Sequence, residues 1–390
     1  LGAVDGSGVA SALAIAEDKA LVHGPLDLLY TVDEEIGLVG AGKLVEGELL
    51  DVTSKYLINV DSEDWGEITL SSAGGVDRRL VIPMTRAALD ANTKWNHYEL
   101  EVAQLKGGHS GCEIHAGRAN ALKWVAAMFT ENREAIAGTQ FRIHSFQGGN
   151  AHNAIPSRCV VAFSLPAEKA EAFLIAVSDI FHILTQRYSH IEKTAVKEPR
   201  LTIKPLTETP KDTPLTYSSS RTALKFIQAV HHGVWSFSEA VPTLVESSQS
   251  LSVAKLTEKE FEVEVFARSS VDQALKVFPK LLEDLAQLYG GHVVQYQDDS
   301  PGWPAMPDSR LCKSAVAVFK KEFGSDPKLV PIHAGLECGI IINKYPKNQL
   351  EAISIGPTLK SPHTIDEHMY LDTACQLYTY LQKLITDLAN

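Results

Sequence analysis

The feature that most constrains the fold is an alternation of strand and helix patterns that stops and later resumes. An alanine-rich helical pattern at 9–21 is followed by two short apolar runs, at 26–32 and 56–60, that are typical of buried strands. After residue 300 the same pattern returns, with a helix at 309–323 and a strand at 350–355. Strands that alternate with helices predict an α/β domain with a mainly parallel sheet.

The sequence between these two parts has a different pattern, in which the strands show polar alternation. Such alternation is typical of an antiparallel sheet that is covered on one face. A loop rich in Pro, Thr and Ser at 205–220 separates two strand–helix–strand passages. Their predicted elements are 97–102, 120–129 and 159–163, then 260–266, 272–288 and 292–296. We therefore predict an α/β domain formed by 1–75 and 299–390, with an α+β domain inserted at 76–298.

The composition excludes several classes of protein. Hydrophobic residues at 45% and charged residues at 22% fit a soluble globular chain, and a net charge of -12 disfavours nucleic acid and anionic membranes as partners. No apolar run reaches the ~18 residues that a membrane span needs. The five cysteines are an odd number without a Cys-x-x-Cys pair, which argues against a disulfide framework and favours a reducing, cytoplasmic setting.

Potential metal ligands follow the predicted strands of the α/β part. Glu34 and Glu35 follow the first apolar run, Asp61 follows the second, and His363 follows the strand at 350–355. Ligands bind beyond the carboxyl ends of such strands, and oxygen and imidazole donors without sulfur suit a hydrolytic Zn²⁺ or Mn²⁺ site. Because neighbouring side chains point in different directions, one glutamate can bind metal while the other moves protons. Acidic residues after strands also occur in solvated turns and helix caps, so this alternative stays open.

Short motifs along the chain carry a family resemblance. In order, they are GAxxGxG at 2–8, TVDEEIG at 31–37, NVDSE at 59–63, LKGGHSG at 105–111, NAIP at 153–156, HAGLECG at 333–339 and SIGP with HTIDE at 354–367. The set resembles the aminoacylhistidine dipeptidases, also called Xaa-His dipeptidases or peptidase D. This family belongs to the di-zinc exopeptidase superfamily that includes carnosinase.

The resemblance implies a cytoplasmic metallo-dipeptidase that hydrolyses Xaa-His and other short unblocked dipeptides. It implies Glu34 as the general base, Glu35 and His363 as ligands of one metal, and Asp61 as a ligand of the other. Two Zn²⁺ ions per active site are expected, with Mn²⁺ or Co²⁺ as alternatives. The α/β part would be the catalytic domain, incomplete at its N-terminus.

The inserted domain would then serve as a lid and as the homodimer interface. In it, His109 is similar to the lid histidine that meets the substrate, and Arg268 to the arginine that grips the substrate carboxylate. Asn153 and, in the α/β part, Glu337 fall in matching loops and are expected to contribute to substrate binding.

The sequence departs from the family pattern near its start. Val4 stands where the family has an aspartate that bridges both metals, and Asp5 follows one residue later. Asp5 is expected either to cap the next helix or, through a local register shift, to replace the missing ligand. The family's upstream His-x-Asp motif has no counterpart, and His152 replaces an arginine. The alternative function is therefore a catalytically impaired, truncated homologue or pseudoenzyme that keeps dimerisation or peptide binding.

Overall fold

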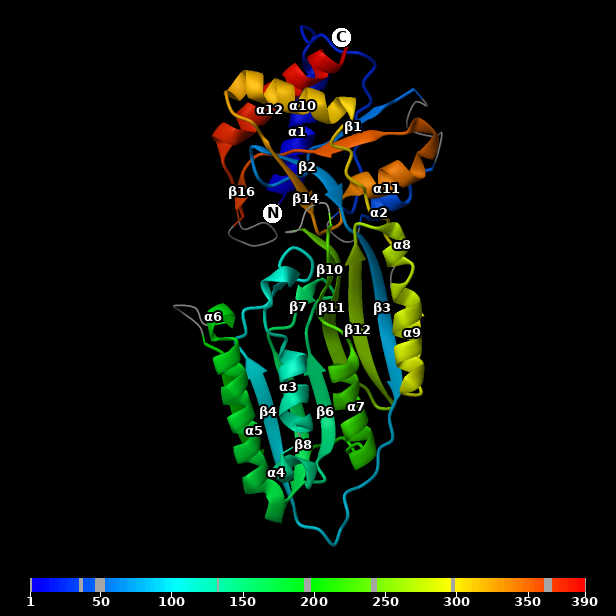
Figure 1. Ribbon diagram of the computed structural model, residues 1–390. Helices are drawn as coiled ribbons and strands as arrows, with labels where there is room; N and C mark the ends of the chain where they lie inside the picture. Colours follow the sequence, from blue (N-terminus) through cyan, green and yellow to red (C-terminus); the bar gives the residue numbers. More distant parts are fainter. Residues whose placement is uncertain are drawn as a thin grey trace. The chain divides into compact units, whose positions relative to one another are not determined.

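The computed structural model describes residues 2–34, 38–45, 53–131, 133–192, 198–239, 244–295, 299–360 and 367–389. The chain forms two compact units. Unit 1 comprises residues 1–74, 270–272 and 300–390, and unit 2 comprises residues 75–269 and 273–299. Figure 1 labels their elements. Among the described residues, no helix is both long enough and apolar enough to cross a membrane.

Unit 1 is built on a four-stranded sheet in the order β1-β15-β2-β14. Its strands are β1 (Tyr56–Asn59), β2 (Glu67–Ser72), β14 (Lys328–Ile332) and β15 (Glu351–Ser354). β1 pairs with β15 and β2 with β14 in parallel, whereas β15 and β2 share one antiparallel bridge. The main helices are α1 (Ala3–Glu17), α10 (Arg310–Phe323), α11 (Glu337–Lys344) and α12 (Leu371–Ala389), with a short α2 (Val39–Gly42). The prediction of an α/β fold with a mainly parallel sheet is confirmed.

The core of unit 1 explains why these helices form. α12 presents Leu377, Leu381 and Leu384, which recur every three to four residues and are buried against the sheet. α10 begins after Ser309, whose hydroxyl accepts a hydrogen bond from the Cys312 backbone N–H as an N-cap. The two-residue strands β16 (Leu359–Lys360) and β17 (His368–Met369) pair with each other in antiparallel fashion just before α12.

The predicted strand at 26–32 is wrong. This segment has no regular secondary structure and is not part of a described ladder, and the side chains of Leu26, Leu28, Tyr30 and Val32 are exposed. Leu29 alone among its apolar residues packs against a small core cluster around Ala41 and Ile341. An apolar run identifies segments that can be buried, but a strand also needs a neighbour with free backbone groups, and the pattern contains no information about that neighbour.

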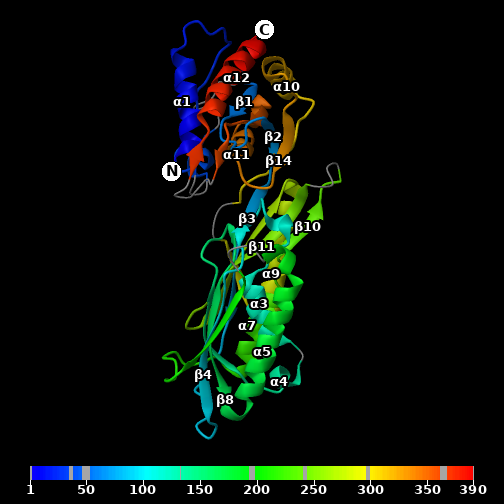
Figure 2. The same cartoon turned by 90° about the vertical axis from the view of Figure 1, so that its left-hand side faces the viewer.

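Unit 2 contains a nine-stranded sheet with helices on one face, as Figure 2 shows for α3, α5, α7 and α9. The strand order is β13-β3-β12-β11-β6-β8-β4-β9, and β10 also pairs with β11. The strands are β3 (Gly74–Pro83), β4 (Trp95–Ala103), β6 (Arg142–Gly148), β8 (Cys159–Pro166), β9 (Arg200–Leu206), β10 (Gly233–Phe237), β11 (Val245–Leu256), β12 (Glu260–Ser269) and β13 (His292–Gln295). The expected α+β arrangement is confirmed.

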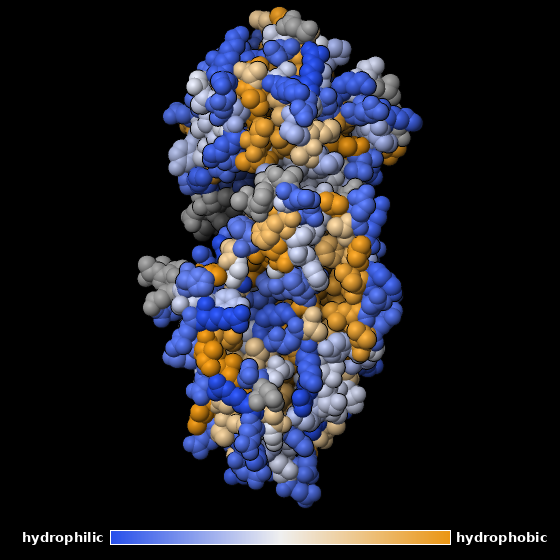
Figure 3. Space-filling view, viewed as in Figure 1, coloured by the Kyte–Doolittle hydropathy of each residue, from blue (hydrophilic) through white to orange (hydrophobic). Residues whose placement is uncertain are grey.

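The helices of unit 2 cover the apolar side of this sheet. They are α3 (Ala121–Thr130), α4 (Glu134–Ala137), α5 (Ala167–Arg187), α6 (Ser189–Glu192), α7 (Tyr217–Ala229), α8 (Asp272–Leu275) and α9 (Phe278–Leu288). We predicted one helix at 272–288, but two are present, because Pro279 lies in the first turn of α9 and has no N–H to continue a preceding helix. Leu281 and Leu288 of α9 and Val277, the residue before it, are exposed. Figure 3 shows that apolar patches also remain on the face of the molecule that it displays.

Candidate functional site

Three carboxylates of unit 1 converge on one point. Asp5, Glu34 and Asp61 each offer an oxygen, and these oxygens all lie within 4.8 Å of one another. Two unit charges at that distance repel by about 3 kcal/mol at an effective dielectric constant near 20, so the cluster favours a bound cation. A set of oxygen donors suits Zn²⁺, Mn²⁺ or Mg²⁺, and the residues present therefore fit a metal ion.

Asp5 reaches the cluster from the first turn of α1. The helix begins at Ala3 with Gly2 as its N-cap residue, so the prediction that Asp5 is the N-cap is wrong. Gly8, one turn later, packs on the end of β1, where a Cβ atom would lie 2.9 Å from the Val60 carbonyl oxygen. Because residues three apart share one helix face, this close approach brings Asp5 to the residue that follows Val60, which is Asp61.

Asp61 is held by contacts between the loops that follow β1 and β15. The Ser62 N–H donates to the Ile355 carbonyl oxygen at 3.3 Å, and the Ser62 and Ser354 hydroxyls lie 2.8 Å apart. Gly356 is required here, because a Cβ atom would lie 1.5 Å from the Ser62 carbonyl oxygen. The parallel pairing of β1 and β15 therefore fixes both strand ends, as expected for a ligand site at the carboxyl edge.

Glu34 lies in a tight turn before α2. Asp33 and Leu38 both have positive φ angles, of 57° and 58°, and the Leu38 N–H donates to the Glu34 carbonyl oxygen at 2.8 Å. Gly40 closes the turn against Val32, where a Cβ atom would lie 2.5 Å from two backbone atoms. The turn positions Glu34 even though no strand precedes it.

Glu337 opens α11 and is buried near this cluster. The Thr31 hydroxyl donates to its Oε1 atom at 2.7 Å. Burial raises the pKa of Glu337, the Thr31 hydrogen bond lowers it, and the charge of Asp5 raises it further. Burial also raises the pKa of the neighbouring Cys338 thiol, with smaller contributions from Glu337 and Asp61. Glu337 is thus electrostatically coupled to the carboxylate cluster.

Other predicted metal-site residues are outside the described parts of the chain. Glu35 lies in the gap at 35–37 and His363 in the gap at 361–366. Their assignment as ligands stays a prediction. The backbone of Val4 lies within α1, but its side chain is not among the parts of the chain that the structure describes.

In unit 2, His109 lies on a loop with a defined geometry. Its Nδ1 atom accepts hydrogen bonds from the Gly111 and Cys112 N–H groups at 3.1 and 2.9 Å, so the proton of the neutral ring resides on Nε2. Its own N–H donates to Glu113 Oε2 at 2.8 Å. Gly108 has a φ of 135°, and a Cβ atom there would lie 1.9 Å from Arg118 Nη1. This positive φ favours glycine at position 108.

Asn153 lies beside His109. The short strands β5 (Gly108–His109) and β7 (Ala154–Ile155) pair antiparallel, and the Ser110 N–H donates to the Asn153 carbonyl oxygen at 2.8 Å. The Asn153 side chain is exposed. The motifs around 105–111 and 153–156 are therefore neighbours in space.

Arg268 is buried at the end of β12, with 5% of its surface exposed. Its guanidinium carbon lies 4.1 Å from the centre of the Phe266 ring, and its Nε atom has no hydrogen-bond partner among the described residues. Burial lowers the pKa of Arg268 to about 10, which the charges of Cys112 and Asp77 oppose. It is still a cation at neutral pH.

Several residues at these sites were missed from the sequence. Asp77 belonged to no motif, Thr31 and Phe266 lay in a quoted motif and a predicted strand without an assigned role, and His152 was noted only as a departure from the family. Asp77 could have been found, because an aspartate inside an apolar strand, in GGVDRRLVI, is rarely buried without a partner.

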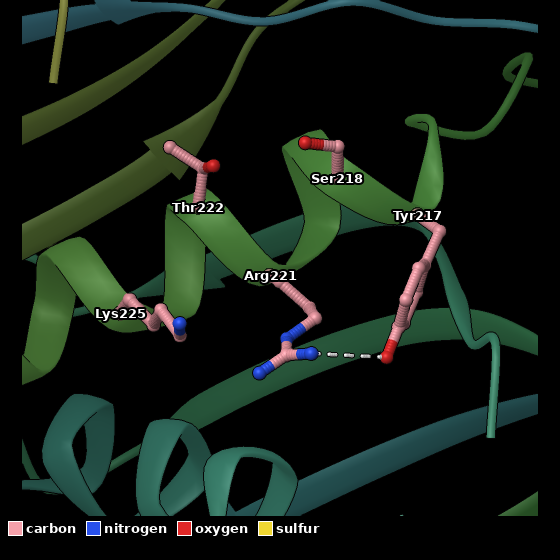
Figure 4. Close-up of a pocket in the computed structure, with 5 residues that line it drawn as sticks. All are labelled: Tyr217, Ser218, Arg221, Thr222 and Lys225. Atoms are coloured by element: carbon pink, nitrogen blue, oxygen red, sulfur yellow. Dashed lines mark hydrogen bonds between the residues drawn. The ribbon is translucent and has the colours of Figure 1, made fainter. Parts of the chain in front are cut away.

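A surface pocket contains none of the candidate residues. It is lined by Tyr217, Ser218, Arg221, Thr222 and Lys225, all from α7, and Figure 4 shows Arg221 directed toward the Tyr217 hydroxyl at 3.3 Å. One helix face that presents two cations without a carboxylate or another catalytic group beside them does not indicate a catalytic site.

Comparisons with known proteins agree with the motif resemblance. The model of the peptidase dimerisation domain matches residues 100–192. The cytosol non-specific dipeptidase of Escherichia coli (strain K12) is 32% identical over 391 residues, which cover 100% of this chain and 76% of that protein. The crystal structure of the aminoacylhistidine dipeptidase from Vibrio alginolyticus covers 99% of this chain and 75% of that one, with 31% identity and a TM-score of 0.82. The resemblance inferred from the motifs is confirmed.

Proposed function

This chain belongs to the aminoacylhistidine dipeptidase family of peptide hydrolases, and from this premise we propose that it hydrolyses Xaa-His and other short unblocked dipeptides in a metal-dependent reaction. The observation that carries the proposal is the convergence of Asp5, Glu34 and Asp61 within 4.8 Å. This convergence supports the proposal that Asp5 binds metal in place of the family's aspartate, whose position is occupied by Val4 in this chain.

Asp5 and Asp61 would hold the metal together with Glu35 and His363. When bound, the metal supplies a Lewis acid and lowers the pKa of water. Glu34 accepts a proton from the attacking water and delivers it to the leaving amine, which is general base and then general acid catalysis. Glu337, whose pKa is raised, contributes to the charge balance of this cluster and to substrate binding.

The residues of unit 2 would bind the substrate. His109 carries its proton on Nε2, so it can donate a hydrogen bond to the oxygen that becomes negative in the transition state. Arg268 would hold the substrate carboxylate, since it is a buried cation without a carboxylate partner among the described residues. Asn153, next to His109, would line the same site.

The family also leads us to propose the remaining properties. Zn²⁺ is the expected metal, with two ions per active site in the family and with Mn²⁺ or Co²⁺ as substitutes. The protein would be a cytoplasmic homodimer that associates through unit 2, which contains the matched dimerisation domain.

Metal content and activity of two variants test this function separately. Asp5→Asn should lose most bound zinc by elemental mass spectrometry after dialysis, because it removes one charged ligand. Glu34→Gln should keep its zinc but lose about 10²- to 10⁴-fold in kcat, because it removes only the base. Asp64→Asn, an exposed neighbour that pairs with Lys360, is the control and should change neither property.

The impaired-homologue alternative predicts a different pattern. In that case the wild type would retain no zinc, and Glu34→Gln would have the same zinc content and activity as the wild type. Val4→Asp, which restores the family residue, would add bound metal and turnover. If Asp5 already serves as the ligand, Val4→Asp adds nothing to the metal content.

A further inference from the structure

We infer that His152, held by Asp77, is a second cationic arm of the carboxylate site of Arg268, and that it takes up a proton when the carboxylate binds. The inference rests on the proposed function where it names the ligand as the free carboxylate of a dipeptide. It assigns a binding role to a residue at which this chain departs from its family.

Asp77 and Arg268 lie on the same face of the sheet in unit 2. Phe266 and Arg268 alternate along β12 with the buried Val265 and Ala267, so they lie on the face opposite the helices. Asp77, two residues before Arg79 on β3, shares that face, because Arg79 forms an ion pair with Glu264 of β12 at 2.9 Å.

His152 is fixed on this face by two contacts. Its Nδ1 atom lies 2.6 Å from Asp77 Oδ2, and its ring stacks on Phe266 with centroids 5.2 Å apart and planes 25° apart. A carboxylate only accepts hydrogen bonds, so the proton is on Nδ1 and Nε2 is at the opposite edge of the ring. The His152 side chain is 31% exposed, whereas that of Asp77 is 2% exposed. His152 is therefore the accessible end of the pair.

The polar groups around His152 are incompletely satisfied. Among the described residues, Asp77 Oδ1 and Arg268 Nε are buried atoms without a hydrogen-bond partner, and no carboxylate forms an ion pair with Arg268. Asp77 acts electrostatically on Arg268, so the two side chains share one environment. Buried charges in proteins are normally paired, so a buried guanidinium without a carboxylate partner among the described residues points to an anion that arrives from outside.

Charge balance gives His152 its role. Asp77 from β3 bonds His152, Arg268 from β12 lies over the Phe266 ring on which His152 stacks, and Cys112 is a further titratable group near Arg268. With neutral His152, the cluster of Asp77 and Arg268 has no net charge, and a bound carboxylate would add one negative charge. One proton taken up on His152 Nε2 restores neutrality and turns that atom into a donor for the carboxylate, while Asp77 stabilises the imidazolium.

The test measures binding without turnover. The probes are N-acetylglycine and its neutral counterpart N-acetylglycinamide, titrated calorimetrically into the full chain at pH 7.5 in two buffers with different ionisation enthalpies. The wild type should bind the acid with uptake of up to one proton and should bind the amide at least tenfold more weakly. His152→Asn should weaken binding of the acid by about 10- to 100-fold, as expected for a lost charged hydrogen bond, and should abolish the uptake.

Two further variants separate this role from a structural one. His152→Arg keeps a permanent cation beside Asp77, so it should retain affinity for the acid but take up no proton. His292→Asn, on the exposed edge strand β13, is the control for the same substitution and should behave as the wild type.

Three results would overturn the inference: equal affinity for acid and amide, unchanged proton uptake in His152→Asn, or proton uptake in His152→Arg. Failure of the proposed function is recognised separately. A chain that binds N-acetylglycine with proton uptake but hydrolyses no dipeptide keeps this site and loses the dipeptidase assignment.

Discussion

Two histidines on either side of Ser164 in the sheet of unit 2 make the stability of the fold sensitive to acid. The Ser164 hydroxyl is 2.7 Å from both His97 Nδ1 and His144 Nε2, and His144 Nδ1 donates to the Asp212 carbonyl oxygen. Burial lowers the pKa of His97, and burial with nearby cations lowers that of His144. The folded state therefore binds fewer protons than the unfolded state, and stability rises with pH.

The stability that these histidines contribute should be lost as the pH falls below their ordinary pKa of about 6.5. We expect the melting temperature to drop between pH 8 and pH 5.5 by roughly 2–4 °C for each kcal/mol lost. In His144→Gln this pH-dependent drop should be smaller, because one of the two titrating groups is absent. An equal drop in His144→Gln and in the exposed control His292→Gln would contradict this account.

Single residues also mark the limit of sequence reasoning at the candidate site. Asp61 was predicted correctly from the strand that it follows, whereas Glu34 reaches the cluster although the strand predicted before it, at 26–32, is absent from the described ladders. Asp5 could not be predicted, because its direction depends on where α1 begins, and a start at Ala3 rather than at 9 places it inside the first turn. One residue in a helix turns a side chain by about 100°, so a ligand cannot be assigned from a motif until its register is known.

At the scale of elements, the packing of α1 on β1 determines whether the carboxylates meet. Gly8→Ala places a Cβ atom 2.9 Å from the Val60 carbonyl oxygen, which is backbone and cannot rotate away. We expect a loss of about 1–3 kcal/mol in the free energy of unfolding and a reduced zinc content, because α1 must shift and Asp5 moves with it.

Gly6→Ala is the matched control in the same helix. A Cβ atom at Gly6 meets nothing within 4 Å, so this variant should be neutral or more stable by up to about 1 kcal/mol. Urea unfolding and elemental analysis of both variants check the prediction. If Gly8→Ala keeps its zinc as Gly6→Ala does, the close approach of α1 to β1 does not position the cluster.

Elements were predictable where their local pattern was sufficient. The strands predicted at 97–102, 159–163, 260–266 and 292–296 and the helices predicted at 120–129 and 309–323 are present as β4, β8, β12, β13, α3 and α10, whereas the other five strands of the unit 2 sheet were not predicted. The segment at 26–32 shows the opposite case, since its composition suits a strand but the structure provides no ladder for it among the described residues. Local sequence predicts the preference of a segment, whereas pairing depends on distant parts of the chain.

At the scale of the whole molecule, the family match points to association through unit 2. The matched dimerisation domain at 100–192 includes α5, on which Ile175 and Ile183 are 56% and 51% exposed. Large aliphatic side chains exposed on a helix within such a domain suit burial against a second copy. We therefore expect the wild type to sediment with twice the 42.5 kDa mass of one chain.

Replacing both isoleucines by glutamate should convert the dimer to monomer, because two charges would be desolvated in an apolar contact. Leu288→Glu is the matched control, since Leu288 is 82% exposed on α9, outside the matched domain, and its replacement should leave the mass unchanged. Analytical ultracentrifugation measures all three proteins at one concentration, and circular dichroism checks that each is folded. A double variant that remains dimeric would show that α5 is not the interface, and a monomeric Leu288→Glu would move the interface to α9.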